Sequence, residues 1–189
     1  MDRVKYLINL NKEIVEKTAL KNCHCKGLYS FIISENPKIR LFIAEPGSEL
    51  EHEESPVPIH AHKYDDIFEV LYGQIIHSIY EKSNDGQVYK SYKYSRISDE
   101  QIIYEYMGEQ ILKKVREIKW HTHYMKASIL HTVQVGKGYT IWTVTEGVED
   151  ESFDNICYSK YDNRITDKSN MYEIVENPIE YINSIIDKL

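Results

Sequence analysis

The apolar positions at the two ends of the chain have helical spacing. Within residues 4–20 the apolar side chains include Val4, Leu7, Ile8, Leu10, Ile14 and Val15. This spacing fits an amphipathic helix better than an alternating strand. Over residues 178–188, Pro178 stands where a helix can begin, and the isoleucines that follow fall on one face. We therefore predict flanking helices over about residues 4–20 and 178–188.

Between these ends, from about residue 28 to 160, short runs of β-branched and aromatic residues are separated by turn residues. The turn Asn84-Asp85-Gly86 lies between two such runs and predicts a hairpin. Gly136-Lys137-Gly138 predicts a second hairpin, between the runs TVQV and YTIWTVTEG. Short strands at this spacing are typical of an all-β sandwich or barrel rather than of repeating βαβ units. The predicted fold class is therefore all-β.

Length and composition indicate one globular domain. The chain has 189 residues, of which 42% are hydrophobic, and no linker or repeat divides it. We predict a single domain over residues 1–189 with a core barrel at about 28–160. No apolar run is long enough for a membrane span, and the charged N-terminal segment lacks the apolar core of a signal peptide. We expect a cytoplasmic protein with no membrane partner.

Charge and cysteine content exclude further classes. The net charge is −7 and no long basic run occurs, so a nucleic-acid partner is not expected. Three cysteines, an odd number, do not suggest a secreted disulfide framework. Tyrosine is abundant, with 16 residues, and alternates with Lys and Ser in YKSYKYS. Ordinary half-exposed strand packing explains this pattern; a stacking platform for a sugar or base is the alternative.

The candidate chemistry lies in the segment PIHAHKYDD, which begins at Pro58. In a strand, alternate residues point to the same face, so His60 and His62 project together and Tyr64 and Asp66 follow with the same parity. Asp65 has the opposite parity. Two imidazoles and one carboxylate on one face form the kind of facial set that non-haem iron favours.

A third imidazole must come from elsewhere in the chain. His131, in SILHTVQV, is the best candidate for the third metal ligand. His121 and His123 form a second HxH pair, and His77 lies in the strand after Gly73. For each of these as a single residue, a hydrogen-bonded core or surface histidine is the alternative.

These residues resemble the cupin superfamily. Its first motif has the form HxH, three or four residues, Glu, six residues, Gly, and its second motif centres on one histidine. His60, His62, Asp66 and Gly73 reproduce the first motif, with Asp where Glu is usual, and His131 follows about seventy residues after His60. The chain departs from the pattern at Glu54, where the motif has glycine, and around His131, where the usual proline, glycine and asparagine are absent.

The resemblance implies a cupin double-stranded β-helix, that is, a jelly-roll barrel, with N- and C-terminal helices and often a homodimer. It implies a divalent metal held by His60, His62 and His131, with Asp66 either as a fourth ligand or bound to one of the histidines. Fe(II) is the expected ion, and Mn, Ni or Zn are alternatives. A small-molecule substrate would bind inside the barrel, where His77, Tyr64 and His123 are the candidate catalytic residues.

Three functions follow from this reading. The first is a non-haem Fe(II) oxygenase of the dioxygenase type, because a three-histidine triad is what the thiol dioxygenases of this superfamily use. The second is a metal-dependent isomerase or lyase of a sugar or small acid, with His77 or His123 as the base. The third is a non-catalytic cupin that binds a small ligand.

Overall fold

The computed structural model describes residues 1–98, 101–160 and 173–189. The elements, in chain order, are α1 (Asp2–Leu10), α2 (Lys12–Thr18), β1 (Leu20–Lys21), β2 (Leu28–Glu35), β3 (Lys38–Ala44), the 3-10 helix η1 (Glu49–Glu51), β4 (Ile59–His60), β5 (Tyr64–Tyr72), β6 (Ile75–Ser98), β7 (Gln101–Ile118), β8 (Thr122–Met125), β9 (Leu130–Val135), β10 (Thr140–Glu149), β11 (Ile156–Ser159), β12 (Glu173–Ile174) and α4 (Pro178–Ile186).

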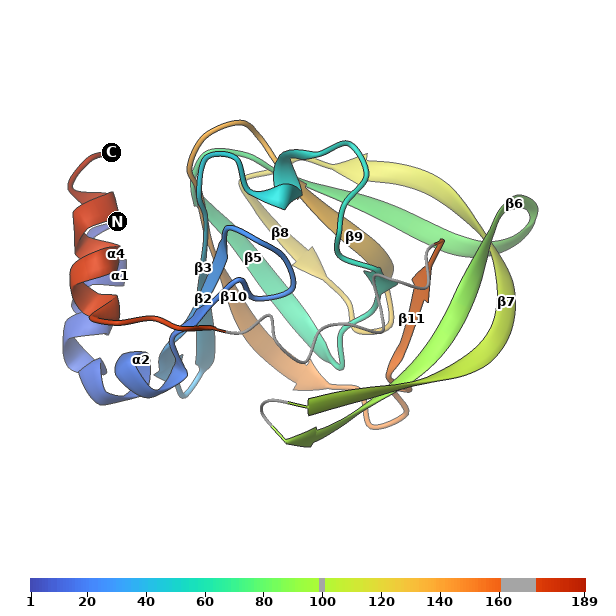
Figure 1. Ribbon diagram of the computed structural model, residues 1–189, viewed down its shortest axis with the longest axis horizontal. Helices are drawn as coiled ribbons and strands as arrows, with labels where there is room; N and C mark the ends of the chain where they lie inside the picture. The colour runs from blue at the N-terminus through green and yellow to red at the C-terminus, as the bar shows by residue number, and fades with distance from the viewer. Residues whose placement is uncertain (99–100, 161–172) are drawn as a thin grey trace.

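The strands form two antiparallel sheets (Figure 1). The first sheet has the order β12-β1-β2-β3-β10-β5-β8, and the second has the order β11-β4-β9-β6-β7. The described chain is mostly β, with helices near its two ends, so the coarse prediction of an all-β, barrel-like fold is confirmed. The predicted helix over residues 4–20 is two shorter helices, which meet at Asn11.

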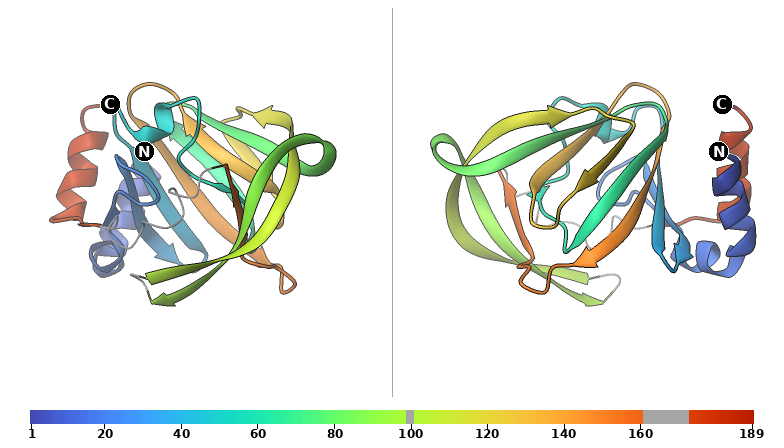
Figure 2. Two further views of the ribbon diagram at one scale, coloured as in Figure 1. Left: turned by 45° about the vertical axis from the view of Figure 1, so that its right-hand side comes forward. Right: turned by 180° about the vertical axis from the view of Figure 1, so that it is seen from behind.

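The helices cover the outer face of the first sheet. Figures 1 and 2 show α1, α2 and α4 together at one end of the molecule, beside β2 and β3. Strand alternation explains this arrangement. Phe31 and Ile33 of β2 and Leu41 of β3 pack with Ile8 and Ile182 of the helices in one apolar cluster.

The inner faces of the two sheets enclose a second apolar cluster. Trp142 and Val144 of β10 and Phe68 and Val70 of β5 contribute from the first sheet, and Ile79 of β6 contributes from the second. On β10, Ile141 belongs to the cluster under the helices while Trp142 faces inward. Strand β10 therefore contributes alternate residues to the two cores.

Both predicted hairpins are wrong. Strand β6 runs through Asn84-Asp85-Gly86 without reversing, and residues 83–86 form a bulge between Lys82 and Gln87, which both pair with Leu112 of β7. Gly136–Gly138 joins β9 to β10, but these two strands lie in different sheets. Both segments do interrupt the strand pattern, as their residue types predict, but neither joins two paired strands.

The long strands β6 and β7 form a bent two-stranded ribbon (Figure 2). The first part of β6, residues 75–80, pairs with β9. Beyond the bulge, Lys90–Lys93 pair with β11, which also pairs with β4. Strands β11, β4, β9 and β6 thus close into a ring at the end of the molecule away from the helices.

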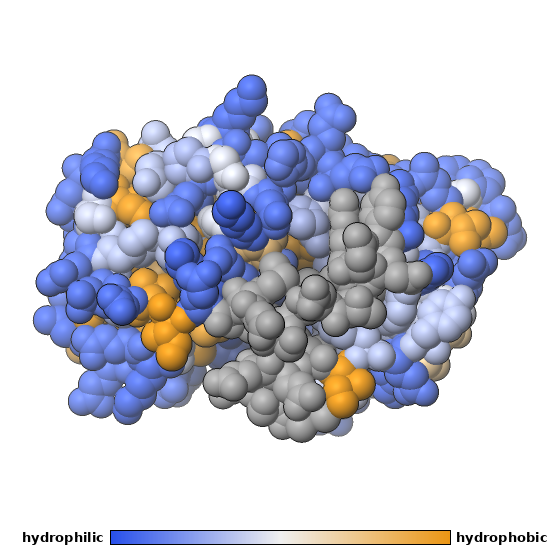
Figure 3. All heavy atoms as spheres, viewed as in Figure 1, coloured by the Kyte–Doolittle hydropathy of each residue, from blue (hydrophilic) through white to orange (hydrophobic). Residues whose placement is uncertain are grey.

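The surface is largely hydrophilic on the face shown in Figure 3, with scattered apolar patches. Among the described residues, none of the helices has both the length and the apolar composition that crossing a membrane requires. Cys23, Cys25 and Cys157 are buried, and none of them forms a disulfide.

Candidate metal centre

Two adjacent strands of the second sheet bring His60 and His131 together. His60 ends β4, and its Cα partner in β9 is His131. His62 follows where the chain leaves β4 for the first sheet, and its ring centroid lies 5.1 Å from that of His60 and 4.9 Å from that of His131. One ring nitrogen from each of the three histidines lies within 4.8 Å of the others. The structure therefore brings together the three histidines that the sequence predicts.

Each of these imidazoles has its Nδ1 atom next to an oxygen acceptor. Nδ1 of His60 lies 2.9 Å from the carbonyl oxygen of Pro58, and Nδ1 of His131 lies 3.1 Å from that of Ile129. Nδ1 of His62 contacts Oδ2 of Asp66. A carbonyl oxygen only accepts hydrogen bonds, so Nδ1 of His60 and of His131 must carry the proton. The same holds for His62 opposite an ionised carboxylate.

This arrangement leaves Nε2 of each neutral ring as an unprotonated acceptor. Nε2 of His60 lies 3.1 Å from Nε2 of His62. Two lone pairs that face each other at this distance repel unless a cation or an extra proton lies between them. In proteins, a histidine that binds a metal is commonly oriented by a hydrogen bond from the ring nitrogen that does not bind the metal. The geometry therefore fits a cation bound by three Nε2 atoms.

Asp66 approaches the site from the other sheet. The structure divides residues 60–66 between two strands, with His60 in β4 and Asp66 in β5, so they are not one continuous strand as the parity argument assumes. Asp66 nevertheless faces inward and is 2% exposed. Its Oδ2 contacts His62, and its Oδ1 has no hydrogen-bond partner among the described residues. The carboxylate of Asp66 is therefore placed to orient His62, and its buried Oδ1 atom remains available to bind another group.

Asp65 lies on the opposite face of β5. Its carboxylate accepts hydrogen bonds from the hydroxyl of Tyr124 and from the backbone amide of Ala127. The first of these bonds contributes most to lowering the pKa of Asp65. The carboxylate of Asp65 is therefore hydrogen-bonded on the outside of the sheet and does not lie among the histidines.

His77 and His123 extend the group of three to five neighbouring imidazoles. The ring centroid of His77 lies 5.2 Å from that of His131 and 4.8 Å from that of His123. Both side chains are buried, and their ring nitrogens have no hydrogen-bond partner in the part of the chain that the structure describes. Buried polar groups are normally paired, so these nitrogens are the kind of exception that a functional role explains.

Burial keeps the inner histidines neutral. It holds the pKa of His77 and of His131 well below the usual value, and the neighbouring histidines add to both shifts. Burial also lowers the pKa of His123, although the backbone of Trp120, near the ring but outside hydrogen-bond geometry, opposes the change. Neutral imidazoles have the lone pairs that metal binding requires.

Phe68 is a central residue that the sequence reasoning missed. Its ring stacks on His123, with centroids 5.0 Å apart and an interplanar angle of 2°, and meets His77 edge to face at 4.6 Å. It also lies 5.9 Å from His62. Its parity with Asp66 on β5 was the available signal, because both residues then face the interior. The carbonyl groups that orient the histidines gave no sequence signal.

Tyr64 lies at the start of β5, opposite Glu149 of β10. The ammonium group of Lys63 lies 5.8 Å from the centroid of the Tyr64 ring. Among the residues that the structure describes, Tyr64 makes no ring contact with any of the five histidines. Of the three candidate catalytic residues, the structure thus brings only His77 and His123 to the cluster. His121, the partner of His123 in the second HxH pair, is exposed.

A scan against protein-family models finds no match for this chain, and neither does a search of curated protein sequences. The function is therefore argued from the geometry of the site.

Proposed function

We propose that this chain is a cupin-type jelly roll that binds a divalent metal through His60, His62 and His131 and acts as a non-haem Fe(II) oxygenase on a small molecule. The observation that carries the proposal is the convergence of three imidazoles whose Nδ1 atoms all have acceptors. One ring nitrogen of each histidine lies within 4.8 Å of the other two, which is a metal-binding arrangement.

The spacing of the donors supports a metal ion. Two nitrogens bound ~2.1 Å from one ion and at right angles to each other would lie ~3.0 Å apart. The two Nε2 atoms of His60 and His62 lie 3.1 Å apart. Their separation therefore already suits two neighbouring positions around one ion.

The connections between the sheets support the jelly-roll topology. β5 continues into β6 through Gly73, and β9 continues into β10 through Gly136–Gly138, and each pair of strands spans the two sheets. Chains that pass repeatedly between facing antiparallel sheets are typical of jelly rolls. The metal ligands lie on the inner face, at the point where the chain first leaves the second sheet.

A bound Fe(II) ion would supply a Lewis acid with open coordination positions for dioxygen and substrate. Three neutral imidazoles contribute no charge, so the site would favour an anionic substrate, such as a thiolate. Asp66 would hold His62 in its binding orientation. His77, which burial keeps neutral, has one ring nitrogen available to accept a hydrogen bond or a proton from a substrate and one N–H group available to donate.

A second candidate is a metal-dependent isomerase or lyase acting on a sugar or small acid. The observation that favours it is the pair of unpartnered imidazoles, His77 and His123, beside the three predicted ligands. A base at this position could move a proton next to a carbonyl group. A non-catalytic cupin that binds a small ligand is the third candidate; it would need neither dioxygen nor turnover.

Elemental analysis of the purified protein, followed by oxygen-consumption assays with small thiols and aromatic compounds, tests the proposal. We expect one equivalent of iron and substrate-dependent oxygen uptake. His60→Ala and His131→Ala should lose both, whereas His121→Ala, an exposed histidine, should lose neither. Turnover without oxygen uptake would favour the isomerase or lyase. A wild-type protein that binds no metal would overturn the metal site itself.

A further inference from the structure

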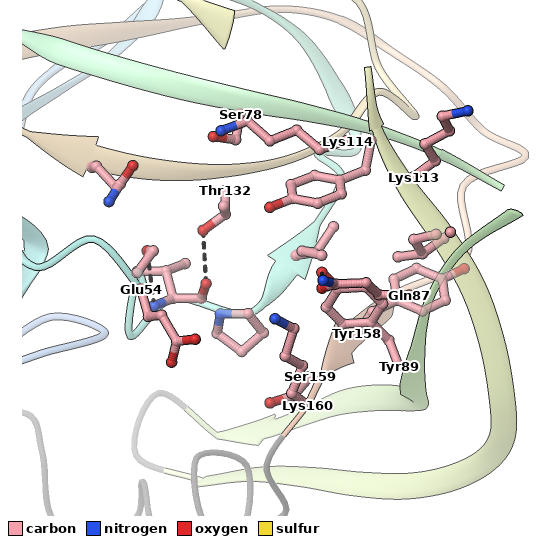
Figure 4. Close-up of a pocket in the computed structure, with 18 of the residues that line it drawn as sticks. Glu54, Ser78, Gln87, Tyr89, Lys113, Lys114, Thr132, Tyr158, Ser159 and Lys160 are labelled. Carbon is pink, nitrogen blue, oxygen red and sulfur yellow. Dashed lines mark hydrogen bonds between the residues drawn. The ribbon is translucent and has the colours of Figure 1, made fainter. Parts of the chain in front are cut away.

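A cavity lies on the opposite side of the second sheet from the histidines. Its volume is about 480 Å³. The outer faces of β4, β6 and β9 form its floor, and the bent part of the β6–β7 ribbon and β11 form its walls (Figure 4). The bulge at residues 83–86 belongs to its rim. A cavity of this size is within the range of small-molecule sites.

Strand alternation separates this cavity from the metal centre. Ile59, Ser78 and Thr132 line the cavity, while their chain neighbours His60 and His131 face inward. Ser78 and Thr132 are Cα partners across β6 and β9. The cavity is thus a distinct site that shares only the backbone of three strands with the histidines.

Tyrosines form the apolar part of the cavity. Tyr80, Tyr89 and Tyr158 line it, and Tyr89 and Tyr158 are packed together with Ile59 and Leu112 in a buried cluster. Burial raises the pKa of all three phenols, that of Tyr89 to about 12. They are therefore neutral hydroxyl donors at physiological pH, attached to flat apolar rings.

Polar groups line the same cavity beside the rings. The side-chain oxygen of Gln87 accepts a hydrogen bond from Tyr89, which leaves the amide NH₂ group free to donate. Figure 4 shows Gln87, Tyr89 and Tyr158 grouped on one side, Glu54 on the other, and Lys160 entering between them. The ammonium group of Lys160 lies 5.7 Å from the centroid of Tyr89.

The charges around the cavity nearly cancel. Lys113 pairs with Asp85 at 2.6 Å, and Lys114 pairs with Glu117 at 2.5 Å. Lys160 also lines the cavity, together with the carboxylates of residues 53 and 54. A highly charged anion would therefore find no excess of positive charge, whereas a neutral ligand with many hydroxyl groups would find donors, acceptors and flat rings together.

We propose that this outer cavity binds a neutral saccharide unit. Ring faces of tyrosine suit the apolar C–H face of a pyranose, and Gln87, Thr132, Ser78 and Lys160 supply hydrogen bonds to its hydroxyl groups. The ligand is either a free monosaccharide or the terminal unit of a glycan, because both present the same chemistry. This site does not rest on the metal centre.

Saturation-transfer difference NMR on the full chain treated with EDTA tests the site. The probes are glucose, galactose and mannose, their methyl glycosides, and the trisaccharide maltotriose, with glucose 6-phosphate as the charged comparison. We expect transfer to at least one neutral saccharide at millimolar concentration. Binding of the free sugars alone would indicate a monosaccharide site, and binding of the methyl glycosides or the trisaccharide as well would indicate a glycan end.

Variants locate the binding. Ser78→Phe should fill the cavity and abolish transfer, and Gln87→Ala, a change at an exposed residue, should weaken binding about three- to tenfold through one lost hydrogen bond. Gln74→Ala, at an exposed glutamine in the β5–β6 turn, is the matched control and should change nothing. The proposal is wrong if no neutral saccharide binds, if only glucose 6-phosphate binds, or if Gln87→Ala binds as tightly as Gln74→Ala.

Discussion

The Nε2 atoms of His60 and His62 lie 3.1 Å apart, although neither ring, while neutral, can donate a hydrogen bond to the other as long as its Nδ1 keeps its acceptor. Such a pair is unfavourable in isolation, because two lone pairs meet in a partly buried place. A shared cation turns the same geometry into a favourable one. The approach of these two nitrogens is thus an unfavourable local contact that the rest of the fold maintains, as is common at functional sites.

Replacing Asp66 tests how the carboxylate acts. In Asp66→Asn the group next to Nδ1 of His62 keeps its size but loses its charge, and we expect metal affinity to fall about 10–100-fold. A competition titration with a chromogenic chelator measures the change. Asp65→Asn, on the outer face of β5, is the control and should leave affinity unchanged. A loss as complete as that of His60→Ala would mean instead that Asp66 binds the metal directly.

Removing the metal should lower the thermal stability of the protein. A ligand present at 100 times its Kd stabilises the folded state by about 2.7 kcal/mol, which corresponds to about 5–10 °C in Tm for a domain of this size. Differential scanning calorimetry with and without EDTA measures this shift. His131→Ala should show no such shift, because it no longer binds the ion. An equal EDTA effect in both proteins would place the stabilising ion elsewhere.

The stability of the metal-free protein should fall as the pH falls below about 6.5. Burial holds the pKa of His77 well below its usual value, so the unfolded chain binds a proton over a pH range in which the folded chain does not. Stability is complete above the unfolded pKa and decreases by up to about 1.4 kcal/mol per pH unit until the folded pKa is reached.

Urea unfolding of the EDTA-treated protein at several pH values measures this dependence. His77→Phe places an apolar ring among Phe68 and the other imidazoles and removes two unpaired nitrogens. We expect this variant to unfold with a shallower pH dependence than the wild type. Identical slopes for the two proteins would show that His77 is not a source of the acid sensitivity.

Gly73 is required where β5 crosses into β6. Its φ is +76°, and a Cβ atom there would lie 2.6 Å from Oγ1 of Thr140 and from the carbonyl oxygen of Tyr139. Gly138 also has a positive φ but open space around it. We expect Gly138→Ala to cost about 1–2 kcal/mol for its conformation alone and Gly73→Ala to cost more. Chemical denaturation of both variants compares the two costs, and equal losses would contradict the close approach.

The sequence predicted the local features of this protein better than it predicted which strands pair. The HxH spacing identified His60 and His62, and the residue pattern identified helices near both ends. The turn residues at 84–86 and 136–138 correctly predicted interruptions of the strand pattern. They did not reveal which strands pair, because β6 pairs with β7, β9 and β11, and β10 pairs with β3 and β5. At Gly86 a Cβ would collide with the carbonyl group of Leu112, a contact that no short stretch of sequence reveals.

The same reason limits prediction of the site. His77 and His123 are separated in sequence from His60 by other strands, and only sheet packing brings their rings beside Phe68. The sequence named both as candidate catalytic residues, but nothing local indicated that their rings would lie together, with that of His77 beside His131. The acceptors Pro58 and Ile129 act through backbone carbonyl groups, which every residue has.

Strand β9 places His131 on one side of its sheet and Thr132 on the other. Substitutions along such a strand affect one compartment at a time, but a change in its length affects both. Inserting or deleting a single residue before His131 would turn this proposed metal ligand toward the tyrosine-lined cavity and the threonine toward the histidines. The length and register of β9 are therefore constrained on both of its faces. We expect homologues to differ more in the residue types of β9 than in the number of its residues.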